Sequence, residues 1–182
     1  MALLSLIRHP DTSCAVLDGI DVEVARTGER AFVLHYVARG DIAGLKLSPP
    51  VRYSSRGDDL WQTTCFEAFV RPHAGDGYAE LNFAPSTAWA AYGFSAYREG
   101  MRPIALQPPL VDIERGDGRL ELFVTLDSDD IALPADSAWQ LNITAVIEEI
   151  DGRKSYWALA HPPGKPDFHH PDCFVLSLPA AG

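Results

Sequence analysis

Short runs in which apolar and polar residues alternate recur along the chain. Clear examples are residues 3–7, 20–25, 31–37, 120–126 and 139–147. Alternation with a period of two is typical of β-strands that turn one face to a core. Turn signals separate these runs roughly every 8–12 residues, with loops at 27–30 and 127–138, and no run has a helical period. The pattern predicts an all-β fold, a single-domain antiparallel β-sandwich of immunoglobulin-like or jelly-roll-like type over residues 1–182.

Two of the alternating runs carry unusual polar residues on one face. In residues 65–70 and 78–83 one face is wholly apolar, whereas the other face carries Glu67, Glu80 and Asn82. The Pro, Gly and Asp residues between the two runs indicate a hairpin. We therefore expect the three polar side chains to share the outer face of one sheet, where they would form the floor of a binding surface.

The register of this hairpin decides which polar residues meet. A turn centred on His73 and Ala74 would place Glu67 directly opposite Glu80. Like charges at directly opposed positions are destabilising unless something compensates them. We therefore expect an arginine, a metal ion, a shared proton or a ligand hydroxyl beside the two carboxylates. A further strand at 89–94 would place Tyr92 beside Glu80 on the same face.

Length and charge narrow the class of protein. The chain has 182 residues, 47% of them hydrophobic, and a net charge of −10. The acidic balance argues against nucleic acid or an anionic membrane as partner. No apolar run approaches the ~18 residues of a membrane span. Three widely spaced cysteines without a CxxC pair favour reduced thiols, so we expect a soluble, cytoplasmic protein.

A block of motifs in the middle of the chain resembles a known family. The motifs are Asp59-Leu-Trp-Gln-Thr-Thr-Cys-Phe-Glu67, Tyr78-Ala-Glu-Leu-Asn-Phe-Ala-Pro85, Trp89-Ala-Ala-Tyr92 and Tyr97-Arg-Glu-Gly-Met101. Together they resemble the bacterial DOMON-like domains, which are related to the family 9 carbohydrate-binding modules. The resemblance implies a β-sandwich that binds a sugar or, in other branches, haem. It covers nearly the whole chain.

The resemblance can be transferred residue by residue. Family 9 modules place a tryptophan before an acidic strand motif, and Trp61 with Glu67 lies at the matching place. These modules hold the sugar between two aromatic rings, and the second ring here would be Trp89, Tyr92 or Trp157. The acidic groups that ligate structural calcium in secreted members are not recognisable in this chain. No metal or other cofactor is therefore expected if the ligand is a sugar.

The sequence thus predicts a non-catalytic domain that binds a small ligand, in the first place a carbohydrate or a sugar-containing metabolite. Aromatic rings would cover the apolar face of the sugar, while charged and amide groups would bind its hydroxyls. A proline-rich loop at 161–172 would close the rim. The predicted ligand-binding residues are Trp61, Glu67, Glu80, Asn82, Trp89, Tyr92, Arg98, Trp157, His161, Asp167 and His169.

The sequence leaves four alternatives open. Arg98 or Arg56 could neutralise the two carboxylates in a purely structural network. Two carboxyl groups about 5–5.5 Å apart are also the machinery of a retaining glycosidase, with Glu67 and Glu80 as the pair. A haem-binding module and a protein-interaction domain complete the set. The three histidines of the 161–172 loop match no compact metal motif, so we expect that loop to be structural rather than ligating.

Overall fold

The computed structural model describes residues 2–27, 30–131, 133 and 136–180. In this part of the chain there are thirteen strands, four short 3-10 turns and no α-helix. The two expected loops, at 27–30 and 127–138, each include residues outside these ranges. Gly28 and Glu29, expected at the turn between the first long strands, lie outside the described residues, while Ser128–Ile131 of the second loop form a 3-10 turn.

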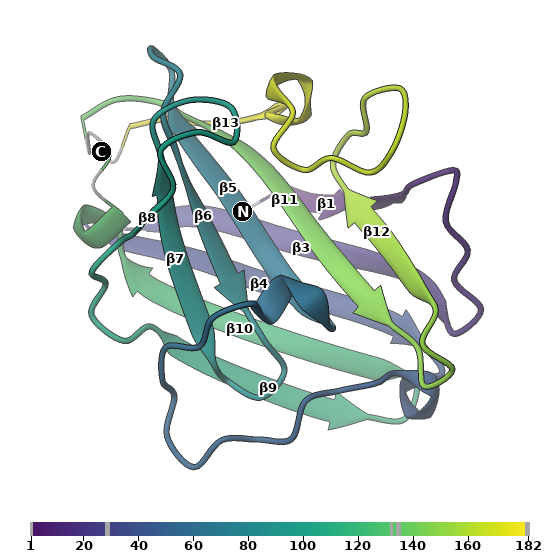
Figure 1. The fold of residues 1–182 in the computed structure, drawn as a ribbon. Coiled ribbons are helices and arrows are strands. Elements are labelled where there is room, and N and C mark those ends of the chain that lie inside the picture. Colours follow the sequence, from purple (N-terminus) through teal and green to yellow (C-terminus); the bar gives the residue numbers. More distant parts are fainter. Residues whose placement is uncertain (1, 28–29, 132, 134–135, 181–182) are drawn as a thin grey trace.

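The strands form two antiparallel sheets that face each other as a sandwich (Figure 1). Sheet A contains, in spatial order, β1 (Ala2–Ser5), β3 (Leu17–Thr27), β4 (Ala31–Gly40), β10 (Arg119–Asp127) and β9 (Leu110–Gly116). Sheet B contains β2 (Ile7–Arg8), β12 (Lys154–Ala158), β11 (Trp139–Glu148), β5 (Cys65–Pro72), β6 (Tyr78–Phe83), β7 (Trp89–Phe94) and β8 (Arg102–Pro103), with β13 (Leu176–Leu178) also paired to β11. The predicted all-β antiparallel sandwich is confirmed.

The first predicted strand divides between the two sheets. Residues 2–5 pair with β3 in sheet A, whereas Ile7 and Arg8 pair with β12 in sheet B. Leu6 lies between them and is 5% exposed in the core. The short connections are 3-10 turns: η1 (Ile42–Gly44), η2 (Leu60–Gln62), η3 (Ser128–Ile131) and η4 (Pro171–Cys173).

The main hydrophobic core lies between the sheets and follows from the alternation of each strand. The apolar faces of β5 and β6 meet β4 and β10 there, with Phe66, Leu81 and Leu122 fully buried. Tyr36 on β4 is also fully buried, and its hydroxyl donates to the backbone carbonyl of Glu67 at 2.8 Å. This bond gives the buried tyrosine hydroxyl a hydrogen-bond partner. It also holds the backbone of β5 at Glu67.

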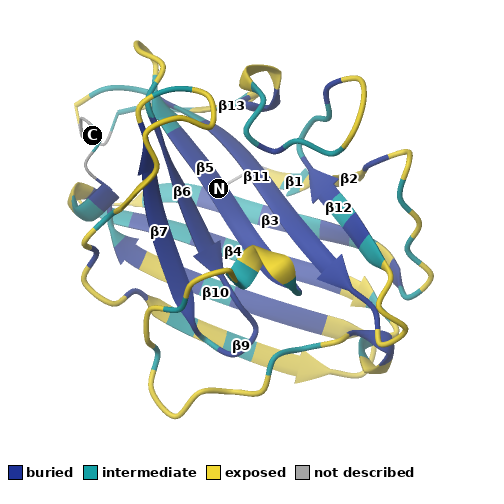
Figure 2. Cartoon of the chain, in the orientation of Figure 1, coloured by how far each residue is buried: buried dark blue, intermediate teal, exposed yellow. Residues whose placement is uncertain are grey.

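The outer face of sheet B is also covered by other parts of the chain, whereas the outer face of sheet A is not. All residues of β6 and β7 are buried, and Figure 2 shows both strands uniformly dark. A second cluster of apolar residues lies on this face, including Phe69, Phe94, Phe168 and Phe174. In Figure 1, η2 lies in front of sheet B, and residues 161–175 lie at the upper ends of its strands. Because Phe168 and Phe174 of this segment pack in the second cluster, β5, β6 and β7 have apolar contacts on both faces.

Candidate functional site

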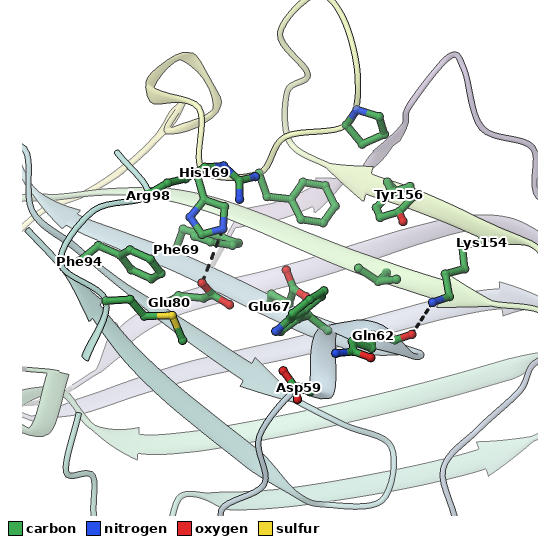
Figure 3. A pocket seen from close by; sticks show the side chains of 15 residues that line it. Asp59, Gln62, Glu67, Phe69, Glu80, Phe94, Arg98, Lys154, Tyr156 and His169 are labelled. Carbon is green, nitrogen blue, oxygen red and sulfur yellow. Dashed lines mark hydrogen bonds and ion pairs between the residues drawn. The ribbon is translucent and has the colours of Figure 1, made fainter. Parts of the chain in front are cut away.

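A cavity of about 760 Å³ lies on the outer face of sheet B. Its floor comes from β5, β6 and β11, and its walls come from η2, β12 and the loops after β7 and β12 (Figure 3). The lining residues are Asp59, Trp61, Gln62, Glu67, Phe69, Glu80, Phe94, Arg98, Met101, Val146, Lys154, Tyr156, Pro166, Phe168 and His169. Aromatic rings and charged groups therefore face one space of small-ligand size.

Glu67 is the most deeply buried acid of the cavity. Its side chain points from β5 into the cavity in Figure 3, yet the residue is only 2% exposed. Oε2 accepts a hydrogen bond from the Thr144 hydroxyl at 3.1 Å, whereas Oε1 is buried without a donor. Burial, together with the charge of Glu80, raises the pKa of Glu67 well above its usual value.

Glu80 is better satisfied than Glu67. Its Oε1 accepts from the Asn82 amide at 2.8 Å, and its Oε2 lies 3.7 Å from Nε2 of His169. Burial raises the pKa of Glu80, although the Asn82 hydrogen bond and the charge of Arg98 oppose the rise. Both oxygens of Glu80 therefore have a neighbouring polar group, whereas only one oxygen of Glu67 does.

The predicted direct opposition of Glu67 and Glu80 is wrong by two residues. In the hairpin, Glu67 pairs with Asn82, and Phe69 pairs with Glu80. A shift of two keeps every side chain on its face, so both acids still point into the same cavity. The next pair was predicted correctly, since Tyr92 lies beside Glu80. The direct cross-strand opposition from which the glycosidase alternative was argued is not observed.

His169 lies next to Glu80 on the cavity wall, and its ring contacts the hydroxyl of Tyr78. The Tyr78 hydroxyl accepts a hydrogen bond from the backbone N–H of Arg98 at 3.1 Å, and it lies 2.7 Å from Nδ1 of His169. We assign the hydroxyl proton to the bond with Nδ1, which leaves the proton of the neutral ring on Nε2, facing Glu80. Burial and the charge of Arg98 lower the pKa of His169 to about 4, so the ring is neutral at pH 7.

Arg98 belongs to a tight turn tied to the 161–172 loop. Its backbone has a positive φ of 55°, which is uncommon outside glycine. Its guanidinium donates to Asp167 Oδ1 at 2.8 Å, and the Tyr97 hydroxyl donates to the other oxygen of Asp167. Oδ1 also accepts from the backbone N–H of His169 at 3.1 Å. Asp167 therefore joins the turn at 95–101 to the loop that carries His169.

Trp61 lies on η2 at the cavity entrance. It is 47% exposed, an unusual position for so large an apolar side chain. The Lys154 ammonium donates to the backbone carbonyl of Gln62, which ties η2 to β12. On the other side Tyr92 donates to Asp58 at 2.7 Å, and burial, followed by this contact, raises the pKa of Tyr92 to about 12. Both contacts hold the segment that presents the indole.

The structure brings together five of the predicted ligand-binding residues as cavity lining: Trp61, Glu67, Glu80, Arg98 and His169. Asn82, Tyr92 and Asp167 do not line the cavity, but each bonds a residue of the site or a residue next to it. Tyr92 bonds Asp58, in the segment that carries Trp61. Asn82 bonds Glu80, and Asp167 bonds Arg98 and His169.

Three other predicted residues lie away from the cavity. Trp89 and Trp157 are each 5% exposed and belong to the core between the sheets. They alternate onto the inner face of β7 and β12, so neither ring is placed to serve as the second stacking ring. His161 bonds the backbone carbonyl of Ile7 through Nε2 at 2.7 Å and meets His9 edge-on.

The sequence interpretation missed most of the apolar wall. Tyr156 lines the cavity where Trp157 was predicted to contribute, because period-two alternation in β12 sends neighbours to opposite faces. Met101, to which the sequence analysis gave no role, is 59% exposed at the cavity edge. Phe69 was recognisable, since it shares the Glu67 face of β5. Phe168 and Pro166 come from a loop without any period.

No arginine neutralises the two acids by an ion pair in the described part of the chain. Arg98 pairs with Asp167, and Arg56 pairs with Asp58 at 3.5 Å. Nor do the described residues contain a group of three or more His, Cys, Asp or Glu that could hold a metal ion. They also contain no helix with the length and apolarity needed to cross a membrane. The haem and protein-interaction hypotheses stay predictions.

The fold and the cavity together define an antiparallel β-sandwich with a ligand-sized hollow on one outer face. No protein-family model and no curated protein matches the chain. The chain is similar to the crystal structure of a proposed carbohydrate-binding protein from Bacteroides uniformis ATCC 8492. The TM-score is 0.70 at 18% sequence identity, over 95% of this chain and 84% of that chain. This likeness shows a shared fold.

Two further structures show a family 9 carbohydrate-binding module from Caldicellulosiruptor kristjanssonii, one in complex with glucose and one with cellotriose. Each gives a TM-score of 0.46 at 9% identity. The glucose complex covers 80% of this chain and 69% of its own, and the cellotriose complex covers 88% and 75%. These three similar structures are thus of carbohydrate-binding proteins, and for the Bacteroides protein that activity is itself a proposal.

Proposed function

We propose that the cavity on the outer face of sheet B binds a small carbohydrate without converting it. One observation carries the proposal: a half-exposed indole at the entrance faces a floor of two buried acids, and one oxygen of Glu67 lacks a protein donor. A sugar ring offers an apolar C–H face for an aromatic plane and hydroxyl donors for carboxylates. The fold shared with a proposed carbohydrate-binding protein supports the same class of ligand.

Each group of lining residues has a role in this proposal. Trp61 would cover one face of the sugar, and the rings of Phe94, Tyr156 and Phe168 would form the apolar wall. Glu67 and Glu80 would accept hydrogen bonds from hydroxyls on the floor. The 760 Å³ cavity is within the range of pockets that enclose one small ligand.

The proposal is tested by calorimetric titration of the protein with mono- and disaccharides, using Trp61→Ala as the variant. We expect at least one sugar to bind the wild type and to bind Trp61→Ala roughly 5- to 10-fold more weakly, since an aromatic contact is worth about 1 kcal/mol. Tyr53→Ala is the matched control, because Tyr53 is 72% exposed and does not line the cavity.

Several results would contradict the proposal. A wild-type protein that binds no sugar, or a Trp61→Ala variant that binds like the wild type, would remove the assigned role of the indole. Steady turnover of an aryl glycoside, lost in Glu67→Gln, would show a hydrolase instead of a binding protein. Binding of haemin alone would favour the haem alternative.

A further inference from the structure

The cavity floor holds two acids and no basic side chain in an ion pair with them. Among the described residues, the nearest basic group recorded against either acid is His169 Nε2, 3.7 Å from Glu80. That ring is neutral at pH 7 because burial lowers its pKa to about 4. Arg98 is engaged with Asp167. Two carboxyl groups, 2% and 6% exposed, therefore lack a protein counter-charge in contact.

Two oxygens of residues paired across β5 and β6 also lack any donor among the described residues. Glu67 Oε1 and Asn82 Oδ1 are both buried without a hydrogen-bond partner. The two residues are paired directly across β5 and β6, on the same face of the sheet. Side chains in such pairs have Cβ atoms about 4.5–5.5 Å apart. When Glu67 is ionised both atoms are acceptors, and Glu67, which lines the cavity, is the one that a donor-rich ligand group can reach.

An ammonium group fits these two observations better than a hydroxyl does. It offers three N–H donors, whereas a hydroxyl offers one. It also brings the positive charge that two buried acids lack, and charge-assisted hydrogen bonds are roughly twice as strong as neutral ones. Leaving a buried acid unpaired is costly, so the floor should distinguish a cationic ligand from a neutral one of the same size.

We propose that the carbohydrate bound here carries a protonated amine, and that its ammonium group is held on the cavity floor by Glu67, with Glu80 supplying the second negative charge. This inference rests on the proposed function and deepens it by naming the class of sugar.

Binding of such a ligand is coupled to a proton. Burial and the charge of Glu80 raise the pKa of Glu67, so the empty site retains a proton on Glu67 above the pH at which an exposed glutamate would lose it. The ammonium replaces that proton: the carboxyl group releases H⁺ to solvent, and the resulting carboxylate pairs with the ligand cation. The net charge of the site is unchanged by this exchange.

The other charged or titratable groups that face this space come from every surrounding element. They are Asp59 directly before η2, Glu80 on β6, Arg98 in the turn after β7, Lys154 and Tyr156 on β12 and His169 in the 161–172 loop. Lys154 donates to the backbone carbonyl of Gln62 at the cavity wall. The basic side chains therefore stand at the walls, and the acids without counter-charge lie on the floor.

The test is calorimetric titration of the intact protein with four probes: glucosamine, glucose, N-acetylglucosamine and cyclohexylamine. Titrations run in buffers of different ionisation enthalpy, below the pKa of the amine. We expect glucosamine to bind at least tenfold more tightly than glucose or N-acetylglucosamine, with measurable proton release. Glu67→Gln should abolish both the preference and the release, and Glu80→Gln should weaken the preference.

Asp59→Asn is the matched control. It removes one acid that lines the cavity away from the floor, and asparagine tolerates the positive φ of 58° at this position. The preference for glucosamine should survive this change, which separates a defined ammonium site from general attraction by negative charge. Proton release by the wild type needs no variant, so the inference stays testable even if Glu67→Gln does not fold.

The outcomes separate the two proposals. Equal binding of glucose and glucosamine, or binding of glucosamine without proton release, overturns the ammonium site and leaves carbohydrate binding in place. Binding of cyclohexylamine with no binding of any sugar overturns carbohydrate binding and leaves a site for amines. Loss of the glucosamine preference in Asp59→Asn also contradicts the inference, because the selectivity would then not depend on the floor.

Discussion

Its surroundings keep His169 neutral, and the hydroxyl of Tyr78 gives the ring a defined orientation. The hydroxyl accepts from the Arg98 backbone and contacts Nδ1 of the ring, while Phe69 and Phe94 meet the ring edge-on. The apolar surroundings oppose a charge on the ring, which is the main reason for its lowered pKa. His169 therefore presents a single N–H to the cavity over the whole physiological pH range.

Replacement of His169 by glutamine should weaken the acid sensitivity of the fold. The unfolded chain takes up a proton at this histidine near pH 6.5, whereas the folded protein does so only near a pKa of about 4. Between these values the unfolded state binds more protons, so stability falls as pH falls. The wild type should lose roughly 3 kcal/mol through this group across that window.

Urea unfolding of wild type and His169→Gln at several pH values between 4 and 7 measures this contribution. The variant should lose less stability on acidification. Tyr156→Phe, which removes only a cavity-lining hydroxyl, should follow the wild type. Parallel curves for wild type and His169→Gln would show that the ring is not held neutral by its surroundings.

At the scale of elements, the cavity is closed by a junction between two loops. Asp167 accepts bonds from Tyr97, from the Arg98 guanidinium and from the His169 backbone. No strand pairing links these segments to each other, so this carboxylate is the principal polar connection between them among the described residues. The strained backbone of Arg98 is retained at this junction.

Asp167→Asn should loosen both loops with little effect on global stability. The Arg98 side chain is 52% exposed, so the ion pair itself contributes at most about 1 kcal/mol. Amide hydrogen exchange should accelerate up to about fivefold in residues 95–101 and 166–170, because a loss of about 1 kcal/mol of local stability changes an opening equilibrium by that factor. Asp127→Asn, which removes an exposed ion pair with Arg30, is the control. Acceleration spread over β3 and β4 would contradict a local role.

The central hairpin shows what strand patterns predict and what they omit. Alternation correctly assigns Glu67, Glu80 and Asn82 to one face. The observed pairs centre the turn between Ala74 and Gly75, one residue later than predicted. Gly75 has a φ of 105°, a conformation open to glycine, so the turn is decided by local backbone geometry that alternation does not encode. Moving the turn centre by one residue shifts the pairing between β5 and β6 by two residues.

The cavity walls illustrate a second limit. Trp89 and Trp157 were predicted from their residue type, although their place in the alternation of β7 and β12 sends them to the core. Tyr156 was predictable from the same alternation. Met101 and Phe168 were not, because they reach the cavity from loops, and the path of a loop depends on contacts between distant segments.

At the scale of the molecule, stability is concentrated in the two-sided strands of sheet B. Leu81 on β6 is fully buried in the core between the sheets. Leu81→Ala should cost about 2–5 kcal/mol and lower the thermal midpoint by roughly 5–15 °C. Leu110→Ala is the control, since Leu110 on the edge strand β9 is 76% exposed, and it should change stability by less than about 0.5 kcal/mol.

Thermal and urea unfolding measure both variants. A small effect of Leu81→Ala, similar to that of Leu110→Ala, would mean that β6 is not packed on the side facing sheet A. The cavity should be perturbed only indirectly, because Leu81 points away from Glu80.

The contact of Tyr78 with His169 joins positions 91 residues apart. During folding, a contact between such distant positions requires a loss of loop-closure entropy before any contact energy is gained, so contacts of this kind form slowly. The hairpin of β5 and β6 can form from local sequence alone, yet the wall above its acids arrives only with the last part of the chain. The binding site is therefore complete only after the last part of the chain has packed against sheet B.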